Sequence, residues 1–87
     1  MGLDTVELIL SIEDTFDIEI SDAVAEKIYT VGDLHEFVFS ELTRLERLNI
    51  NREIVFDVLR SLVCSQLGVK PDEVVPSAHF VNDLHAD

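Results

Sequence analysis

Hydrophobic residues recur at helical spacing along most of this chain. In the stretch from Leu3 to about Thr15, Leu8 and Ile12 lie four residues apart, and Phe16 continues the same stripe. Spacing of this kind is typical of an amphipathic helix that buries one face. Two further apolar positions widen the stripe, Val6 and Ile9. The first element is therefore predicted to be a helix.

The alternating sequence DIEI at 17–20 predicts a short extended loop after this helix. Ser21 or Asp22 can cap a short helix that runs through Ile28. The sequence TVGD at 30–33 is a variant capping box, with Asp in place of Glu, and it predicts the start of a longer helix. The inward positions expected in that helix are Leu34, Phe37, Val38, Leu42, Leu45 and Leu48.

The candidate break before the last helix is 49–51, which contains neither Gly nor Pro. Asn51 can cap a helix that runs to Leu67 and ends at Gly68. Its expected inward positions are Ile54, Val55, Val58, Leu59, Leu62 and Val63. Pro71 opens a short turn. The rest is predicted to be mostly irregular, anchored by Val74, Val75, Phe80, Val81 and Leu84.

These elements predict an all-α bundle, since helical spacing dominates and almost no strand pattern is present. The sequence has 87 residues, which is near the lower size limit for a self-sufficient core, so a single domain is expected. Apolar residues make up 47% of the chain, a share that excludes a disordered protein.

The net charge of the chain limits the classes of partner that it can bind. Eighteen acidic residues against six basic ones give a formal charge of −12, which repels nucleic acid phosphates and favours basic protein surfaces. A single cysteine, Cys64, forms no internal disulfide and favours a reducing compartment. Neither a signal peptide nor a membrane span of about 20 apolar residues is expected, so a cytoplasmic location is predicted.

Two long strings resemble the acyl carrier protein family, but in reversed order. The string NREIVFDVLRSLVCSQLGVKPDEVVPSAHFVNDLHAD, at 51–87, is similar to the first half of that family. The string LDTVELILSIEDTFDIEISDAVAEKIYTVGDLHEFV, at 3–38, is similar to its second half. The resemblance implies an acyl-carrier-like four-helix bundle, circularly permuted. Residues 1–38 then form the second half, 39–52 a linker or helix extension, and 53–87 the first half.

The sequence lacks the serine that defines a carrier in this family. In the family the two halves meet at a D-S-L triplet, whose serine carries the phosphopantetheine arm. Here Gly2 stands at the serine position, directly before LDTVEL, and Asp87 matches the Asp that precedes the serine. No other serine has a D-S-[LIV] context. We therefore expect no phosphopantetheine and predict no cofactor.

The resemblance also implies that the first helix is the one that partner enzymes recognise. The matching apolar and acidic docking positions are Leu3, Val6, Leu10, Glu7 and Asp14. Their spacing independently places them on one helical stripe, away from the stripe of Leu8 and Ile12. The alternative is that a small bundle buries both apolar edges, and that the acids only keep it in solution.

The segment 39–52 decides how the bundle closes. It lengthens the fourth helix by about two turns past the end that the family implies. If the chain reverses near Asn49, one molecule closes its own bundle. If the helix instead runs through 49–51, two chains exchange halves in a domain-swapped homodimer. The sequence leaves both arrangements open.

Candidates for catalysis or metal binding are few. One cluster holds side chains that bind divalent metals, but its spacing matches no dedicated site, so no metal site is predicted; its members are His79, Asp83, His85 and Asp87. Cys64 is expected to be a small core residue, and His35 an exposed helix residue. No catalytic arrangement is present, and we expect no enzymatic activity.

The predicted function is a non-catalytic docking module in fatty-acid or polyketide-type acyl metabolism. Its expected partners are enzymes with basic docking patches, because the first helix is acidic. Two alternatives stay open. One is an active acyl carrier whose arm attaches at an unrecognised site or to a serine of a partner chain. The other is a small bundle that binds a free fatty acid.

Overall fold

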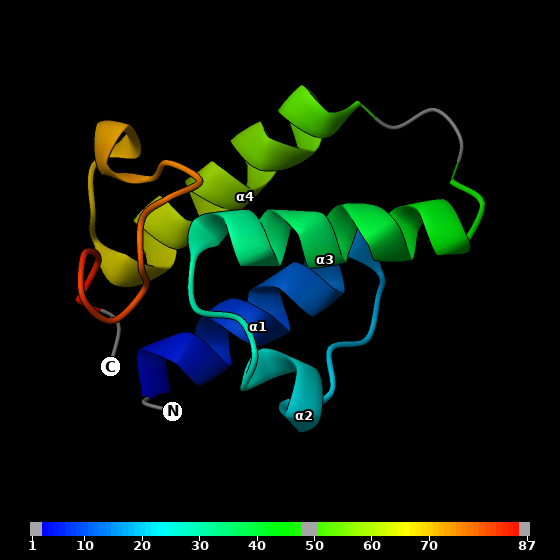
Figure 1. The fold of residues 1–87 in the computed structure, drawn as a ribbon, viewed down its shortest axis with the longest axis horizontal. Helices are drawn as coiled ribbons and strands as arrows, with labels where there is room; N and C mark the ends of the chain where they lie inside the picture. Colours follow the sequence, from blue (N-terminus) through cyan, green and yellow to red (C-terminus); the bar gives the residue numbers. More distant parts are fainter. Residues whose placement is uncertain (1–2, 48–50, 86–87) are drawn as a thin grey trace.

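The computed structural model describes residues 3–47 and 51–85, and the regular elements found in them are helices. They are α1 (Leu3–Phe16), α2 (Asp22–Ala25), α3 (Val31–Arg44), α4 (Arg52–Leu67) and the 3-10 helix η1 (Pro71–Glu73). The three long helices form the body of the molecule, with α2 and the segment after α4 at its periphery (Figure 1). This arrangement confirms the predicted all-α fold.

Local sequence determines where α2 and α4 begin and end. The Ser21 hydroxyl accepts a hydrogen bond from the N–H of Val24, and the Asn51 side chain accepts one from the N–H of Glu53 at 2.7 Å. Each cap satisfies a first-turn donor that has no partner within its helix. α4 ends at Gly68, whose φ of 68° lies in the left-handed region that glycine adopts readily.

α3 begins with the capping box predicted at 30–33. The Thr30 hydroxyl accepts from the N–H of Asp33 at 3.1 Å, and the Asp33 carboxylate accepts from the N–H of Thr30 at 3.1 Å. The same carboxylate oxygen also accepts from the N–H of Tyr29. Bonds from the backbone of Tyr29, and then of Thr30, favour the ionised form and hold the pKa of Asp33 below its usual value.

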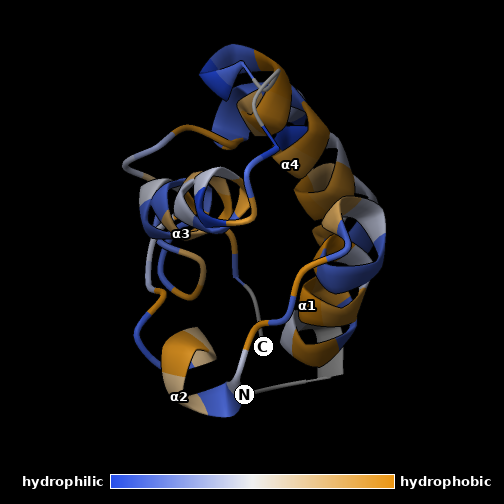
Figure 2. Ribbon diagram, turned by 90° about the vertical axis from the view of Figure 1, so that its right-hand side faces the viewer, coloured by the Kyte–Doolittle hydropathy of each residue, from blue (hydrophilic) through white to orange (hydrophobic). Residues whose placement is uncertain are grey.

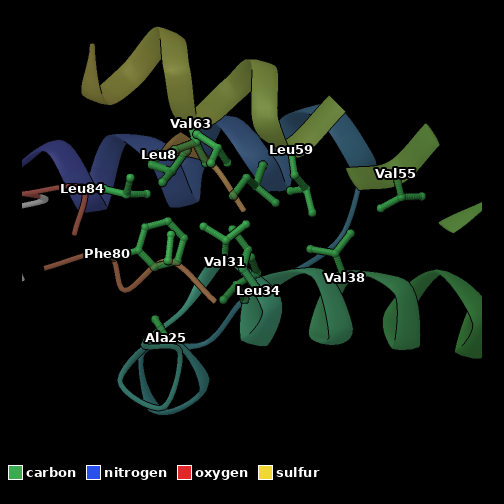
Figure 3. Packing of buried hydrophobic residues seen from close by; sticks show 14 of the residues in the cluster. Leu8, Ala25, Val31, Leu34, Val38, Val55, Leu59, Val63, Phe80 and Leu84 are labelled. Carbon is green, nitrogen blue, oxygen red and sulfur yellow. The ribbon is translucent and has the colours of Figure 1, made fainter. Parts of the chain in front are cut away.

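The hydrophobic core lies where α1, α3 and α4 meet. Hydrophobic and hydrophilic residues are found together on each of these helices, as amphipathic patterning requires (Figure 2). Figure 3 shows Leu8 of α1 close to Val63 of α4, with Val31 and Leu34 of α3 opposite. Ile12 is fully buried, and α1 packs on α4 within the same chain. Helices from both ends of the sequence therefore share one core within a single chain.

The irregular segment after η1 is fixed to the start of α3. Three backbone hydrogen bonds hold it, from the N–H groups of Val31, Gly32 and Phe80 to the carbonyl oxygens of Ala78, Pro76 and Tyr29, at 3.0, 2.8 and 2.9 Å. Four of its side chains are buried, those of Val74, Ala78, Phe80 and Leu84. Both polar and apolar contacts therefore close this end of the core (Figure 3).

The chain reverses direction after α3. That helix ends at Arg44, and Glu46 has a left-handed φ of 59°. The Arg47 guanidinium donates hydrogen bonds to the carbonyl oxygens of Phe16 and Asp17, the latter at 2.7 Å. Carbonyl groups at a helix C-terminus lack intrahelical partners and attract cations. Arg47 therefore ties the turn after α3 to the end of α1.

The start of α4 is in turn attached to α3. Arg52 forms an ion pair with Glu36, and its guanidinium lies 4.6 Å from the centre of the Phe39 ring. The Nε2 atom of His35 lies 3.0 Å from the carbonyl oxygen of Arg52. α3 is thus not continuous with α4 in this chain, because 45–47 already leave the helix; Asn49 lies outside the described residues.

Five positions expected to be buried are exposed, namely Val6, Ile54, Leu45, Val75 and Val81. The exposed fraction of Ile54 is 63%, because the buried face of α4 follows Val55 and Leu59, about 100° around the helix. Leu45 lies beyond the last turn of α3, as its C-cap. Val75 and Val81 each follow a buried residue in irregular backbone, so the buried neighbour takes the inward position. α2 also ends at Ala25, before the expected Ile28.

Candidate docking surface

α1 presents two different faces. Leu8 and Ile12 are buried, while Phe16 is partly buried at the edge of the core. On the other side, the exposed fractions of the Val6 and Leu10 side chains are 41% and 55%. At these exposures each side chain forgoes only part of the roughly 1.5–3 kcal/mol that full burial of a large apolar side chain provides. The second apolar edge of α1 is thus not used by the core of this chain.

Acidic residues flank these two apolar side chains. Glu7 and Asp14 are both exposed, and with Val6 and Leu10 they make up what we call the α1 face. The Glu7 carboxylate accepts a hydrogen bond from Gln66 of α4 at 2.7 Å, which places Glu7 on the edge nearest α4. The spacing of these four residues keeps them on one side of the helix.

A third acid of α1 has a structural role. Glu13 is half-buried, and its carboxylate accepts a hydrogen bond from the N–H of Ile20 at 2.8 Å. This bond fixes the extended loop that follows α1, in which Ile18 and Ile20 are buried. The Glu13 carboxylate therefore serves as a hydrogen-bond acceptor for the backbone, whereas Glu7 and Asp14 are exposed to solvent.

Three residues of the predicted site are only partly described or lie outside the described residues. The backbone of Leu3 begins α1, but its side chain is not among those that the structure describes. Gly2, which was predicted to stand at the serine position of a carrier, and Asp87 lie outside the described residues. The start of α1 and the segment that ends at His85 nevertheless lie at the same end of the molecule (Figure 1).

An open hollow of about 510 Å³ lies beside the C-terminal part of α1. It is lined by Glu13, Glu19, Ile20, Ser21, Val24, Phe37, Glu41 and Arg44. Arg44 and Glu41 pair across one turn of α3 at 2.8 Å, and the hydrogen bond from Arg44 holds the pKa of Glu41 below its usual value. A polar and open hollow of this kind is unlike the enclosed apolar cavities that hold hydrophobic ligands.

Two side chains of the cluster near the C-terminus, His79 and Asp83, form hydrogen bonds with the backbone. His79 and Asp83 accept hydrogen bonds from backbone N–H groups within their own turn. Within 3–47 and 51–85, no three side chains of His, Cys, Asp or Glu are placed to share a metal ion. Sequence reasoning missed this role of His79, since histidine is rare as a cap compared with Asn or Ser.

Two other candidates are part of the packing. Cys64 is half-buried against the core, as expected. His35 was expected to be an exposed helix residue, but it is half-buried, with its ring centre 5.2 Å from that of Phe56 on α4. The prediction was wrong because α4 crosses α3 at this position. The sequence gives only a histidine four residues before Phe39, a spacing that also occurs on exposed helices, so it does not indicate that His35 is half-buried.

Comparison with known proteins does not assign the chain to a class. No protein-family model matches it, and no solved structure matches it. Among the helices that the structure describes, none has the length and apolar character needed to cross a membrane.

Proposed function

We propose that this chain is an acyl-carrier-like docking module, with its halves in permuted order, that binds enzymes of acyl metabolism without an arm of its own. The observation that carries the proposal is the α1 face, where Val6 and Leu10 are exposed beside the acidic residues Glu7 and Asp14. This face coincides with the residues that the carrier resemblance assigns to docking.

The chemistry of the α1 face defines its partner. Exposed apolar side chains gain about 25 cal/mol for each Å² that a partner covers. Carboxylates on the rim raise the association rate with a basic surface and exclude acidic ones. A formal charge of −12 adds a long-range attraction to the same partners. The expected partner is therefore a protein patch with a shallow apolar pocket surrounded by Lys and Arg.

The permuted arrangement is supported by the packing of the two segments. α1 belongs to the stretch that resembles the family's second half, and α4 to the stretch that resembles the first half. The two helices pack on each other, and the segment after η1 is bonded to the start of α3. A carrier cut before its recognition helix requires both contacts.

Binding to a ketosynthase or an acyltransferase tests the proposal, with affinity measured by titration calorimetry at several salt concentrations. Asp14→Lys is expected to weaken binding about tenfold, because it places a cation against a basic patch. Leu10→Ser is expected to weaken it similarly through lost apolar contact. Wild-type affinity is expected to fall as salt rises.

A charge-matched control separates the α1 face from net charge. Asp72 is exposed on η1, an element that packs on α4. Asp72→Lys changes the net charge as much as Asp14→Lys but leaves the α1 face intact, so it is expected to weaken binding only slightly. Equal losses for the two variants would show that binding follows net charge alone, and the proposed surface would be wrong.

A further inference from the structure

The imidazole ring of His79 holds together the last turn of the described chain. Its Nδ1 atom lies 3.2 Å from the backbone nitrogen of Val81 and 3.2 Å from that of Asn82. Backbone N–H groups can only donate, so Nδ1 accepts both hydrogen bonds through its lone pair. These two hydrogen bonds can therefore form only when the ring is neutral and carries its proton on Nε2.

The backbone around His79 completes a closed turn, residues 79–84, which we call the His79 turn. The N–H groups of Asp83 and Leu84 donate to the His79 carbonyl oxygen at 2.8 and 3.1 Å. The Asp83 carboxylate accepts from the N–H of His79 at 2.7 Å. His79 thus takes the place that Asn or Ser usually holds at the start of a helical turn, and Asp83 reciprocates as in a capping box.

The His79 turn carries two of the apolar anchors of the fold. Phe80 and Leu84 are buried, and Leu84 lies near Leu8 of α1 (Figure 3). Phe80 also donates its N–H to the Tyr29 carbonyl at 2.9 Å, just before α3. The geometry of the turn therefore positions side chains that close the core between α1 and α3.

The ionisable groups that face His79 in the described residues come from two segments. Tyr29 stacks on the imidazole with ring centres 6.1 Å apart, and Asp33 at the start of α3 interacts with it electrostatically. Asp83 lies within the turn itself. The two carboxylates attract an imidazolium, whereas the N–H groups of Val81 and Asn82 repel a protonated Nδ1. A charged ring therefore keeps its attraction to the two carboxylates but loses both hydrogen bonds from Val81 and Asn82.

We propose that protonation of His79 opens the His79 turn, so that mild acid loosens Phe80 and Leu84 from the core. An imidazolium donates from both nitrogens and accepts from neither, so both cap bonds are lost together. Histidine is the side chain whose charge ordinarily changes between pH 5 and 8, so the fold carries a pH-sensitive anchor at the end where α1 begins. This inference is independent of the proposed docking function.

Amide hydrogen exchange followed by NMR tests the switch between pH 8 and pH 5. After correction for intrinsic rates, the protection of the Val81 and Asn82 amides is expected to fall about tenfold or more in acid. His79→Asn keeps an acceptor near the position of Nδ1 but does not titrate, so its protection is expected to stay constant. His85→Asn removes an exposed histidine just outside the turn and is expected to behave as the wild type.

Two results would overturn the inference. One is constant protection of Val81 and Asn82 in the wild type across this range. The other is an equal fall in the His79→Asn variant, which would assign the response to another group. If His79→Asn fails to form the turn, the ring nitrogen shifts of wild-type His79 decide. An unprotonated Nδ1 that gains its proton as the two amides lose protection supports the switch, and a proton on Nδ1 at pH 8 contradicts it.

Discussion

Gly32 lies so close to Pro76 that the contact leaves no room for a side chain. The N–H of Gly32 donates to the carbonyl oxygen of Pro76 at 2.8 Å, and a Cβ atom on Gly32 would lie 2.9 Å from the same oxygen. A backbone oxygen held by neighbouring hydrogen bonds cannot move away easily. The start of α3 and the segment after η1 are thus joined by a contact that requires glycine.

Gly32→Ala is expected to destabilise the fold. In an open helix, alanine is more stable than glycine by about 1 kcal/mol. Here the added methyl group meets backbone, and such overpacking costs about 1–3 kcal/mol, so the loss exceeds the helical gain. Urea unfolding followed by circular dichroism measures the change. Ser40→Ala, at an exposed position of the same helix, is expected to change stability by less than about 0.5 kcal/mol. A Gly32→Ala variant as stable as the wild type would contradict the close approach.

The capping box of α3 predicts that Asp33 makes a pH-dependent contribution to the free energy of unfolding. Its folded-state pKa lies below the ordinary value of 3.8, because the N–H groups of Tyr29 and Thr30 bond to the ionised carboxylate. The contribution is therefore complete above that ordinary value and is lost as pH falls through the lower, folded-state pKa. At pH 7, Asp33→Asn is expected to cost about 0.5–1 kcal/mol, as a weakened cap does.

Unfolding free energies measured from pH 7 to pH 2 test this sign. The difference between wild type and Asp33→Asn is expected to shrink in acid, since both side chains are then neutral. Asp72→Asn serves as the matched control, because Asp72 caps no helix with its side chain in the described structure. A gap between wild type and Asp33→Asn that stays constant down to pH 2 would argue against the ionised cap.

The sequence contains no D-S-L triplet, so we predict that the chain does not accept a phosphopantetheine arm. Incubation with coenzyme A and a phosphopantetheinyl transferase is expected to leave its intact mass unchanged. A carrier protein with the D-S-L serine, included in the same reaction, provides the positive control. A mass gain of one arm would instead favour the alternative of an active carrier, and peptide mapping would then locate the attachment residue.

Much of the helical fold could be read from the sequence because its local signals agree with one another. Asn51 and Gly68 mark the ends of α4, and the capping box of Thr30 and Asp33 marks the start of α3. These residues act on the backbone beside them, so their effect does not depend on distant packing. The helix predicted from Leu3 to about Thr15 was placed within a residue or two by its hydrophobic spacing.

Positions that depend on tertiary contacts were predicted less well. Ile54 has the right spacing for a buried residue, but which face of α4 turns inward is set by α1 and α3. Arg47 gave no sign that it would reach the carbonyls at the end of α1, thirty residues earlier in the chain. His79 likewise appeared to be a metal ligand candidate, and its role as a cap depends on the fold of its own turn.

The sequence predicted which residues make up the α1 face, but not whether that face is buried or exposed. Spacing alone places Val6, Leu10 and Asp14 on one stripe, and the structure leaves that stripe exposed. A sequence cannot decide between two apolar edges of one helix, because either can face a core.

The left-handed backbone at Glu46 is expected to control whether the chain closes on itself or exchanges halves with a second copy. Its φ of 59° costs a residue with a side chain about 1 kcal/mol, so Glu46→Gly is expected to stabilise the turn after α3 by about 0.5–1 kcal/mol. Glu46→Val places a β-branched residue where it is strongly disfavoured and favours continuation of the helix, hence a swapped dimer. Sedimentation equilibrium is expected to show more dimer for Glu46→Val than for Ser40→Val, which has the same new side chain on the exposed face of α3. Equal dimer fractions for the two valine variants would mean that the turn at Glu46 does not control how the bundle closes.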